Sequence, residues 1–290
     1  MTDNKHSDPA SWLKSVMDEF LKCSPENTLQ DTTQEKAFET CLLGFSGGDD
    51  PMYTAYKTHV GPFHWTPLEV FNKAFPTSGA KAEDLTVISW ILPHREATKS
   101  DNRKESAYPS ERWARARIYG EQVNVELRKA MVTALRERGY QGVAPQLFPE
   151  WSVKPTDQYV MASTWSERHA AHASGLGTFG LCDGLITPLG KAMRAGSVVA
   201  RIRIPPTPRP YNDHQAYCLY FSRGLCGQCI SRCPVDALSE KGHDKVKCRE
   251  FLKPVTEEYV KSHYGFDGYG CGLCQTSVPC ESKIPTEDDL

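Results

Sequence analysis

The sequence predicts an α/β domain of the α+β kind followed by a small cysteine-rich domain. Three observations predict this division: helical and strand patterns alternate over residues 1–204, prolines crowd residues 205–210, and eight of the eleven cysteines follow that run. The chain has 290 residues, of which 39% are hydrophobic and 24% charged, enough to bury a core and to form two domains. We therefore expect one domain at 1–204 and a second at 211–290.

The first predicted element is an amphipathic helix near the N-terminus. Its hydrophobic residues repeat at helical spacing and are Trp12, Leu13, Val16, Met17, Phe20 and Leu21. Residues 85–92 are rich in β-branched and aromatic side chains and end before Pro93, which predicts a buried strand. A long helical pattern then runs from Ser110 until Gly139 stops it.

Two further strands complete the expected first domain. A short strand is expected near Val143 and Ala144, and residues 196–204 alternate in polarity as a strand does. That second strand runs straight into the prolines of residues 205–210. Because proline removes a backbone donor and stiffens the chain, this run is typical of a spacer between folded units.

The cysteines after the spacer predict two iron–sulfur clusters. The segment Cys226-x2-Cys229-x3-Cys233-Pro234 is typical of bacterial two-cluster ferredoxins, in which the cysteine before proline ligates the other cluster. We therefore assign the eight cysteines to two four-iron four-sulfur clusters. One set is Cys218, Cys226, Cys229 and Cys280, and the other is Cys233, Cys248, Cys271 and Cys274. The second domain is accordingly expected to be ferredoxin-like.

Zinc and disulfides are the alternative uses of these cysteines. Eight thiolates at similar spacing could hold two zinc ions. The start of the chain carries no secretion signal and no twin arginine, so we expect a reducing cytoplasm, which argues against disulfides. The spacing departs from the common ferredoxin form at Cys218 and Cys280. Outside the two sets, Cys23, Cys41 and Cys182 are each expected to be small buried hydrophobic residues.

Charge and hydropathy restrict the partners. The formal net charge is -2 and no block of like charge occurs, so the sequence shows no electrostatic footprint for nucleic acid, which we do not expect as a partner. No apolar run approaches the roughly 20 residues that span a bilayer, so no membrane partner is expected either.

A glycine motif follows a predicted helix. Thr164 with Glu167 fits a capping box, so a helix should begin there and end at Gly175. The following residues spell Gly-x-Gly-x-x-Gly, but a dinucleotide site needs a strand before the glycines and a helix after them. Here a helix precedes, and a strand is expected at 185–187. The glycines either let the backbone approach another large, flat ligand or form a helix C-cap and tight turn without a ligand.

These motifs, in this order, resemble the epoxyqueuosine reductases and, more distantly, the reductive dehalogenases. Both are corrinoid iron–sulfur enzymes, and the resemblance is specific from about residue 159 to residue 280. It implies that the first domain has a nitroreductase-like fold that holds cobalamin base-off, without a histidine below the cobalt. The chain agrees in lacking the Asp-x-His-x-x-Gly signature of histidine-ligated corrinoid proteins.

The resemblance also implies the residues that contact the corrinoid. These expected cofactor-binding residues are Met161, Ser163, Arg168, His169, Gly175, Leu176, Gly177, Thr178 and Phe179. Within this set the glycine turn would offer backbone contacts, and Arg168 a charged donor for an amide or a phosphate. His172, one turn after His169 on the same predicted helix, could reach the same ligand.

One position departs from the family. Epoxyqueuosine reductases carry an aspartate, thought to be the proton donor, six residues before the Glu167-Arg168 pair, where this chain has Met161. Methionine cannot donate a proton, and general acid catalysis contributes typically 10²–10⁴-fold. Tyr119 is the remaining candidate donor. The chain also ends at Leu290 without the C-terminal helical-repeat extension of many epoxyqueuosine reductases, which argues against tRNA as substrate.

We therefore expect a cobalamin-dependent iron–sulfur oxidoreductase that acts on an unknown small substrate. A low-potential donor such as a ferredoxin or flavodoxin would reduce the clusters. The first alternative is an electron-transfer or corrinoid-handling protein without substrate chemistry of its own, which Met161 favours. The second is a tRNA epoxyqueuosine reductase.

Overall fold

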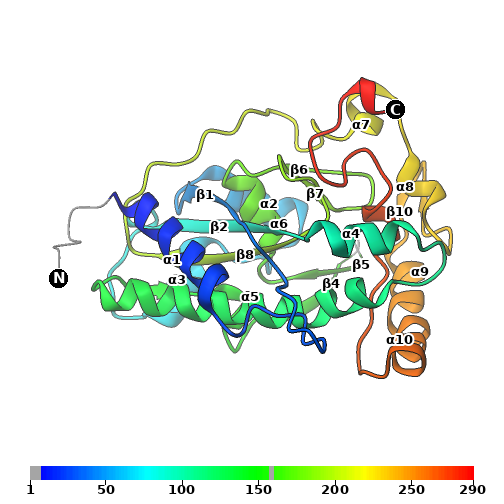
Figure 1. Ribbon diagram of the computed structural model, residues 1–290. Coiled ribbons are helices and arrows are strands. Elements are labelled where there is room, and N and C mark those ends of the chain that lie inside the picture. The colour runs from blue at the N-terminus through cyan, green and yellow to red at the C-terminus, as the bar shows by residue number, and fades with distance from the viewer. Residues whose placement is uncertain (1–7, 157–159) are drawn as a thin grey trace.

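The computed structural model describes residues 8–156 and 160–290 (Figure 1). Residues 1–7, at the start of the expected first domain, and residues 157–159, at the start of the segment that carries the resemblance, lie outside the described residues. No helix of the described part is both long and apolar enough to cross a membrane.

The core of the molecule is a four-stranded sheet. Its strand order is β1 (Leu42–Gly47), β2 (Thr86–Pro93), β8 (Met193–Ala200) and β3 (Gly142–Val143), and every neighbouring pair is antiparallel. The mixed α/β class expected from the sequence is therefore correct in its α+β form, because a doubly wound fold would pair its strands in parallel.

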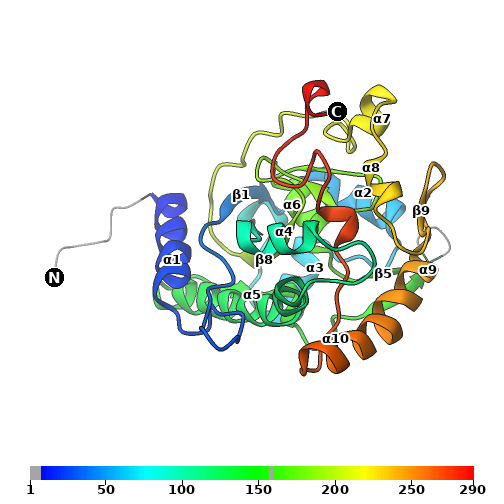
Figure 2. The same cartoon turned by 45° about the vertical axis from the view of Figure 1, so that its right-hand side comes forward.

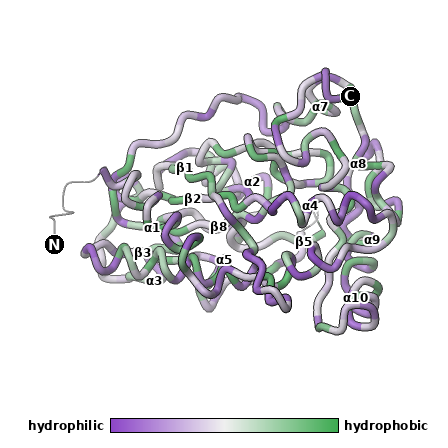
Figure 3. Tube along the Cα trace, in the orientation of Figure 1, coloured by the Kyte–Doolittle hydropathy of each residue, from purple (hydrophilic) through white to green (hydrophobic). Residues whose placement is uncertain are grey.

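Helices cover both faces of this sheet. Alternate residues of β2 point to opposite faces: Ile88 and Trp90 pack with α1 (Pro9–Cys23) and α5 (Glu111–Glu137), while Val87 packs with α2 (Pro51–His59), α3 (Pro67–Ala74) and α6 (Glu167–Ala173). This explains why the segment around β2 is a nearly continuous apolar run. Figure 3 shows the hydrophobic colour along the central strands and in patches on the helices beside them.

The predicted elements of the first domain are present, with shifts at their ends. Ser110 caps α5 by accepting a hydrogen bond from the backbone nitrogen of Trp113, and Gly139 follows the helix with φ +83. The strand expected at 196–204 begins earlier, at Met193, and ends at Ala200. No strand is predicted from the sequence at β1, which is short and contains two glycines.

The predicted capping box before α6 is wrong. Ser166, not Thr164, is the N-cap and accepts from the backbone nitrogen of His169. The Glu167 carboxylate instead accepts hydrogen bonds from buried groups of α5 and β8. After α6, β6 (Thr178–Phe179) pairs with β7 (Leu185–Ile186), so a hairpin and not a helix follows the glycines. The strand expected at 185–187 is confirmed as β7, which ends at Ile186.

The remaining elements are short. In the first part they are η2 (Ala82–Asp84), α4 (Glu96–Arg103), η3 (Pro145–Leu147) and the hairpin β4 (Val153–Thr156) with β5 (Val160–Ser163). In the cysteine-rich part they are α7 (Leu219–Arg223), α8 (Gln228–Ser231), β9 (Leu238–Ser239), β10 (Gly242–His243), α9 (Lys245–Glu250), the π-helix η4 (Phe251–Val255), α10 (Thr256–Tyr264), η5 (Leu273–Gln275) and η6 (Glu287–Asp289).

The cysteine-rich segment packs against the end of the sheet opposite α1, as Figures 1 and 2 show. Arg103 of α4 forms an ion pair with the buried Glu281 carboxylate. The Nε of Arg103 lies 3.0 Å and 3.1 Å from the two carboxylate oxygens. Next to it, Asn102 donates to the carbonyl of Cys271 at 3.2 Å and accepts from the backbone nitrogen of Ser110. Buried polar contacts therefore fix the two parts together, and the division at 204 and 211 stays a prediction.

Candidate functional site

The first predicted cysteine set lines one cavity. The members are Cys218, just before α7, Cys226, between α7 and α8, Cys229, within α8, and Cys280, in the C-terminal loop. Three of them are buried, whereas Cys226 is exposed and has a positive φ of 75. The fold thus gathers four thiols from two distant stretches of sequence at one place.

The second predicted set lines a larger cavity of about 480 Å³. Its members are Cys233, Cys248, Cys271 and Cys274. A fifth thiol, that of Cys182, lies in the same lining and interacts directly with Cys274. The three separate cysteines are each expected from the sequence to be buried hydrophobic residues. This is confirmed for Cys41, which is buried, and wrong for Cys23, which is exposed. Cys182 is buried as expected, but it also interacts with Cys274 of the second set.

The described residues offer no site for a single metal ion. Within residues 8–156 and 160–290, no group of three or more histidine, cysteine, aspartate or glutamate side chains is arranged to hold one ion. This observation tests neither the assignment of the two cysteine sets to clusters nor the zinc alternative, and both stay predictions.

Lys191 lies between the two cysteine sets. It is 3% exposed, and its Nζ donates to the Sγ of Cys182 at 3.5 Å. Burial works against its charge, but nearby cysteine sulfurs raise the pKa of Lys191 well above its ordinary value. Reciprocally, the hydrogen bond with Cys274, together with Lys191, lowers the pKa of Cys182 well below its ordinary value.

The surrounding thiols are chemically suited to cationic iron. Burial raises the pKa of Cys229 and of Cys271 to about 12, so these thiols stay neutral near pH 7 unless a cation stabilises the thiolates. With these thiols neutral, Cys182 alone would compensate the buried ammonium of Lys191. Iron held by thiolates supplies negatively charged sulfur on both sides of the ammonium, so the residues present fit iron–sulfur clusters.

The rest of the larger cavity is walled by the α/β part. A buried ion network supports this wall: Arg128 of α5 is fully buried and lies 3.1 Å from Glu167 and 3.0 Å from Glu121. Arg194 of β8 lies 3.5 Å from Glu121. Burial raises the pKa of Glu167, and Arg128 opposes that shift. The network holds α5, α6 and β8 in fixed relation at the cavity.

Two buried polar atoms beside this cavity have no partner among the described residues. They are Nε of Arg194 and Nδ1 of His94. Burial lowers the pKa of His94 to about 3 and that of Arg194 to about 10. Arg117 also lines the cavity and reaches the hydroxyl of Tyr269 at 2.9 Å. A wall that combines orphaned donors with tryptophan rings suits a large ligand with both polar and apolar surface.

Of the nine expected corrinoid contacts, Ser163 and Arg168 line the cavity. Both are already engaged, Ser163 with the carbonyl of Trp165 and Arg168 with the carbonyl of Asp183. The other seven expected contacts do not belong to the lining: Met161, His169, Gly175, Leu176, Gly177, Thr178 and Phe179.

The glycine turn is packed by the chain's own backbone. A Cβ added to Gly177 would lie 2.3 Å from the carbonyl oxygen of Ile186, and one added to Gly175 would lie 2.7 Å from that of Pro208. Gly175 also has φ +76, the left-handed conformation of a helix C-cap. This favours the C-cap and tight-turn interpretation of the motif over backbone contact with a ligand.

Neither expected proton-donor position lies in the cavity lining. Tyr119 packs against Phe266, with ring centroids 5.8 Å apart. The Met161 sulfur lies 3.0 Å from Nη1 of Arg249. Glu167, which sequence reasoning treated only as part of a motif, does line the cavity, as do Glu121 and His94.

The histidines of α6 belong to a buried aromatic group. His172 Nδ1 lies 2.9 Å from the hydroxyl of Tyr56, and the ring of His169 contacts those of Tyr56, His64 and Phe179. Both ring nitrogens of His64 are buried and without a partner among the described residues. Burial lowers the pKa of His64 and of His172 to about 4.

These two histidines make the fold acid-sensitive. Their folded pKa lies below the unfolded value near 6.5, so the unfolded chain binds the proton first and stability is lost as pH falls below 6.5. From pH 6.5 to 5.5 we expect a loss of about 1 kcal/mol per histidine. Urea unfolding at the two pH values measures the loss. His64→Phe should remove about 1 kcal/mol of the loss, because the other buried histidines with a lowered pKa, His94, His169 and His172, keep their share. An unchanged pH dependence would contradict the prediction.

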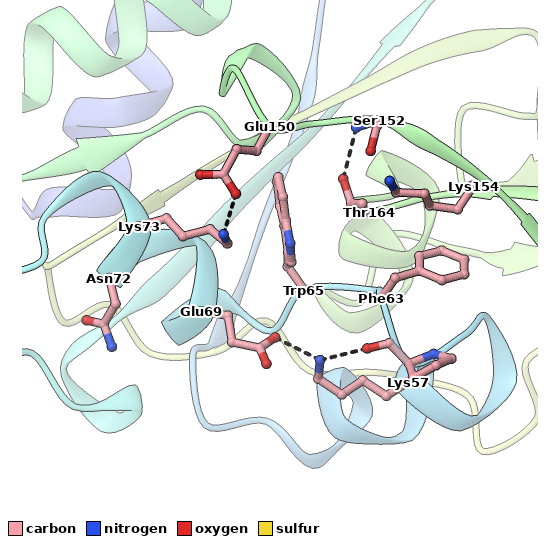
Figure 4. Close-up of a pocket in the computed structure, with 11 residues that line it drawn as sticks. Lys57, Phe63, Trp65, Glu69, Asn72, Lys73, Glu150, Ser152, Lys154 and Thr164 are labelled. Atoms are coloured by element: carbon pink, nitrogen blue, oxygen red, sulfur yellow. Dashed lines mark hydrogen bonds and ion pairs between the residues drawn. The ribbon is translucent and has the colours of Figure 1, made fainter.

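A third concavity, of about 690 Å³, lies between α2, α3 and the β4–β5 hairpin (Figure 4). Figure 4 shows Lys57 paired with Glu69, at 2.9 Å, and Lys73 paired with Glu150 across the groove. Trp65 lies between the two pairs. The groove is open, and none of the sequence-predicted site residues lines it.

Comparison with known proteins identifies structural neighbours. A catabolic reductive dehalogenase in complex with 3-bromo-4-hydroxybenzoic acid aligns over 97% of this chain and 38% of its own, with a TM-score of 0.52 and 13% identity. Another reductive dehalogenase, described as suggesting a mechanism for B12-dependent dehalogenation, aligns over 87% and 31%, with a TM-score of 0.51 and 13% identity. No family model and no curated protein matches the chain.

Epoxyqueuosine reductase from Bacillus subtilis aligns over 95% of this chain and 68% of its own, at 16% identity, but its TM-score of 0.46 is too low to carry an argument. The chain spans less than two fifths of the dehalogenases' length. At these identities the likeness shows the fold alone, and the neighbours belong to the two enzyme groups that the sequence resembles.

Proposed function

We propose that this chain, which shares its fold with reductive dehalogenases, is a cobalamin-dependent iron–sulfur oxidoreductase that acts on a small substrate. One observation carries the proposal. The larger cavity is lined both by the second cysteine set and by residues of α5, α6 and β8, and it meets the cavity of the first set at Lys191. Electron-carrying and substrate-handling groups would therefore lie side by side.

The chain's own residues would divide the work as follows. Cys218, Cys226, Cys229 and Cys280 hold one cluster, and Cys233, Cys248, Cys271 and Cys274 hold the other. Arg117, Arg194 and His94 would offer hydrogen bonds to polar groups of the corrinoid. Trp113 and Trp165 keep the cavity dry. When bound, cobalamin supplies a low-potential, nucleophilic cobalt for reductive cleavage.

Electrons would enter at the first cluster. Cys226 is exposed, whereas the second set opens onto the larger cavity. We propose a ferredoxin or flavodoxin as the donor at this surface. Thiolate-bound iron requires reduced cysteines, so we also propose that the protein works in the cytoplasm.

One observation favours the alternative of an electron-transfer or corrinoid-handling protein. The acid position of the family is occupied by Met161, and neither Met161 nor Tyr119 belongs to the cavity lining. Glu167 lines the cavity and has a raised pKa, so in an enzyme it is the carboxyl group that we propose as the proton source. Glu167→Gln in the loaded protein separates the two: an enzyme loses turnover, and a carrier keeps its cluster reduction rate.

The proposal is tested by anaerobic purification and reconstitution with iron, sulfide and cobalamin. We expect about eight irons and one cobalt per chain, with the electron paramagnetic resonance signal of base-off cobalt(II). Eight irons without cobalt would leave a two-cluster electron carrier. Two zinc ions and no iron would overturn the proposal.

Substitution of single cysteines tests the assignment of the two sets. Cys229→Ala should lose the first cluster and about half of the iron, and Cys271→Ala should lose the second and a similar share. Cys41→Ala, buried but remote from both sets, is the matched control and should keep all the iron. Iron counts that stay full in both ligand variants would show that the assignment is wrong.

A further inference from the structure

We propose that Lys191 sets the reduction potentials of both clusters by holding one buried ammonium group between them. The inference rests on the proposed function, because it requires two clusters at the two cysteine sets. It concerns a residue that belongs to neither set and that lies in the α/β part of the chain.

The backbone fixes Lys191 against the C-terminal cysteine loop. Its own nitrogen donates to the carbonyl of Cys280 at 2.9 Å, and the nitrogen of Ala192 donates to the carbonyl of Glu281 at 3.1 Å. The preceding turn is closed by a hydrogen bond from Gly190 to the carbonyl of Thr187 at 2.8 Å. These hydrogen bonds therefore fix the backbone of Lys191, and its side chain extends into the space between the two cysteine sets.

The position of the side chain is shared by both cavities. Among the described residues, Lys191 is common to the linings of the first and the larger cavity. The sulfurs that act on its charge come from both sets: Cys229 and Cys280 from the first, and Cys274 from the second. Cys182 fixes Nζ from a third direction, at 3.5 Å.

The charge of this ammonium acts on electron transfer. Each cluster gains one negative charge when it is reduced, and a nearby cation stabilises the reduced form more than the oxidised form. Because the site is buried, water and salt screen the interaction weakly. One cation between two clusters therefore raises the potential of both.

Three variants test the inference in the reconstituted protein. Lys191→Met keeps the length of the side chain and removes the charge, Lys191→Arg keeps the charge, and Lys99→Met removes a buried lysine of α4 that pairs instead with Glu96 and Ser282. Iron content and the midpoint potentials of both clusters, followed by electron paramagnetic resonance, are the readouts.

Lys191→Met should keep about eight irons and make both clusters at least tenfold harder to reduce, a fall of 59 mV for a one-electron couple. Lys191→Arg should recover most of that fall, and Lys99→Met should show none. Unchanged potentials in Lys191→Met, or a fall in one cluster only, would overturn the inference.

The two proposals fail in different ways. If the unaltered protein takes up no iron, the proposed function fails and the inference fails with it. If the unaltered protein carries both clusters but Lys191→Met and the milder Lys191→Gln both lose iron, Lys191 is a structural residue and only the inference is overturned.

Discussion

Replacement of Arg128 by methionine should lower the free energy of unfolding by about 3–5 kcal/mol. The guanidinium is fully buried, and its removal leaves the buried carboxylate of Glu167 without its cation and Glu121 with Arg194 alone. A buried charge that has lost its partner is far more costly than the pair itself was worth. Urea unfolding of the cofactor-free protein at pH 7 measures the loss.

Two further variants isolate the cause. Lys129→Met, on the next position of the same helix, breaks the exposed ion pair with Glu126 and should cost less than about 1 kcal/mol. Adding Glu167→Gln to Arg128→Met removes the buried charge that has lost its partner. The double variant should therefore recover part of the lost free energy of unfolding. An Arg128→Met protein as stable as the Lys129→Met protein would contradict the burial argument.

Gly177→Ala should destabilise the cofactor-free protein by about 3 kcal/mol, the upper end of the usual cost of overpacking. The added methyl group would lie 2.3 Å from a carbonyl oxygen of β7, and a backbone atom in a hairpin cannot move aside as a flexible side chain can. Thermal or urea unfolding without cobalamin is the measurement, because it separates folding from ligand binding.

Gly180→Ala is the matched control for this prediction. It lies in the same motif, but its added methyl group would meet the end of the Ile186 side chain at 3.2 Å, which can shift. We expect a loss below about 1 kcal/mol. If Gly177→Ala folds with unaltered stability and instead fails to take up cobalamin, the ligand interpretation of the glycine turn is correct and the packing interpretation is wrong.

Local sequence patterns predicted the helices and strands whose formation depends on residues close together in the chain. The periodicity of α1 and α5, the apolar run of β2 and the start of α5 at Ser110 are properties of single segments, and the structure has them. The spacing of the cysteines likewise divided them into two sets that line two cavities.

Long-range partners escaped sequence reasoning because no local signal marks them. Glu167 fits a capping box with Thr164, yet its carboxylate pairs with Arg128, 39 positions away. Lys191 follows an ordinary turn, and its burial between cysteines arises only when the C-terminal loop packs onto that turn. The glycine turn shows the reverse case, since a ligand-binding pattern proved to be filled by the chain's own backbone.

The crossed arrangement of the cysteines has a consequence for biosynthesis. Cys233 belongs with Cys271 and Cys274, and Cys280 belongs with residues 218–229, so each set draws on both halves of the cysteine-rich segment. Neither set is complete on the ribosome until residues 271–280 have emerged. The ion pair between Arg103 and Glu281 holds the same stretch against α4. Under the proposed function, iron would therefore be inserted only after this stretch has been translated.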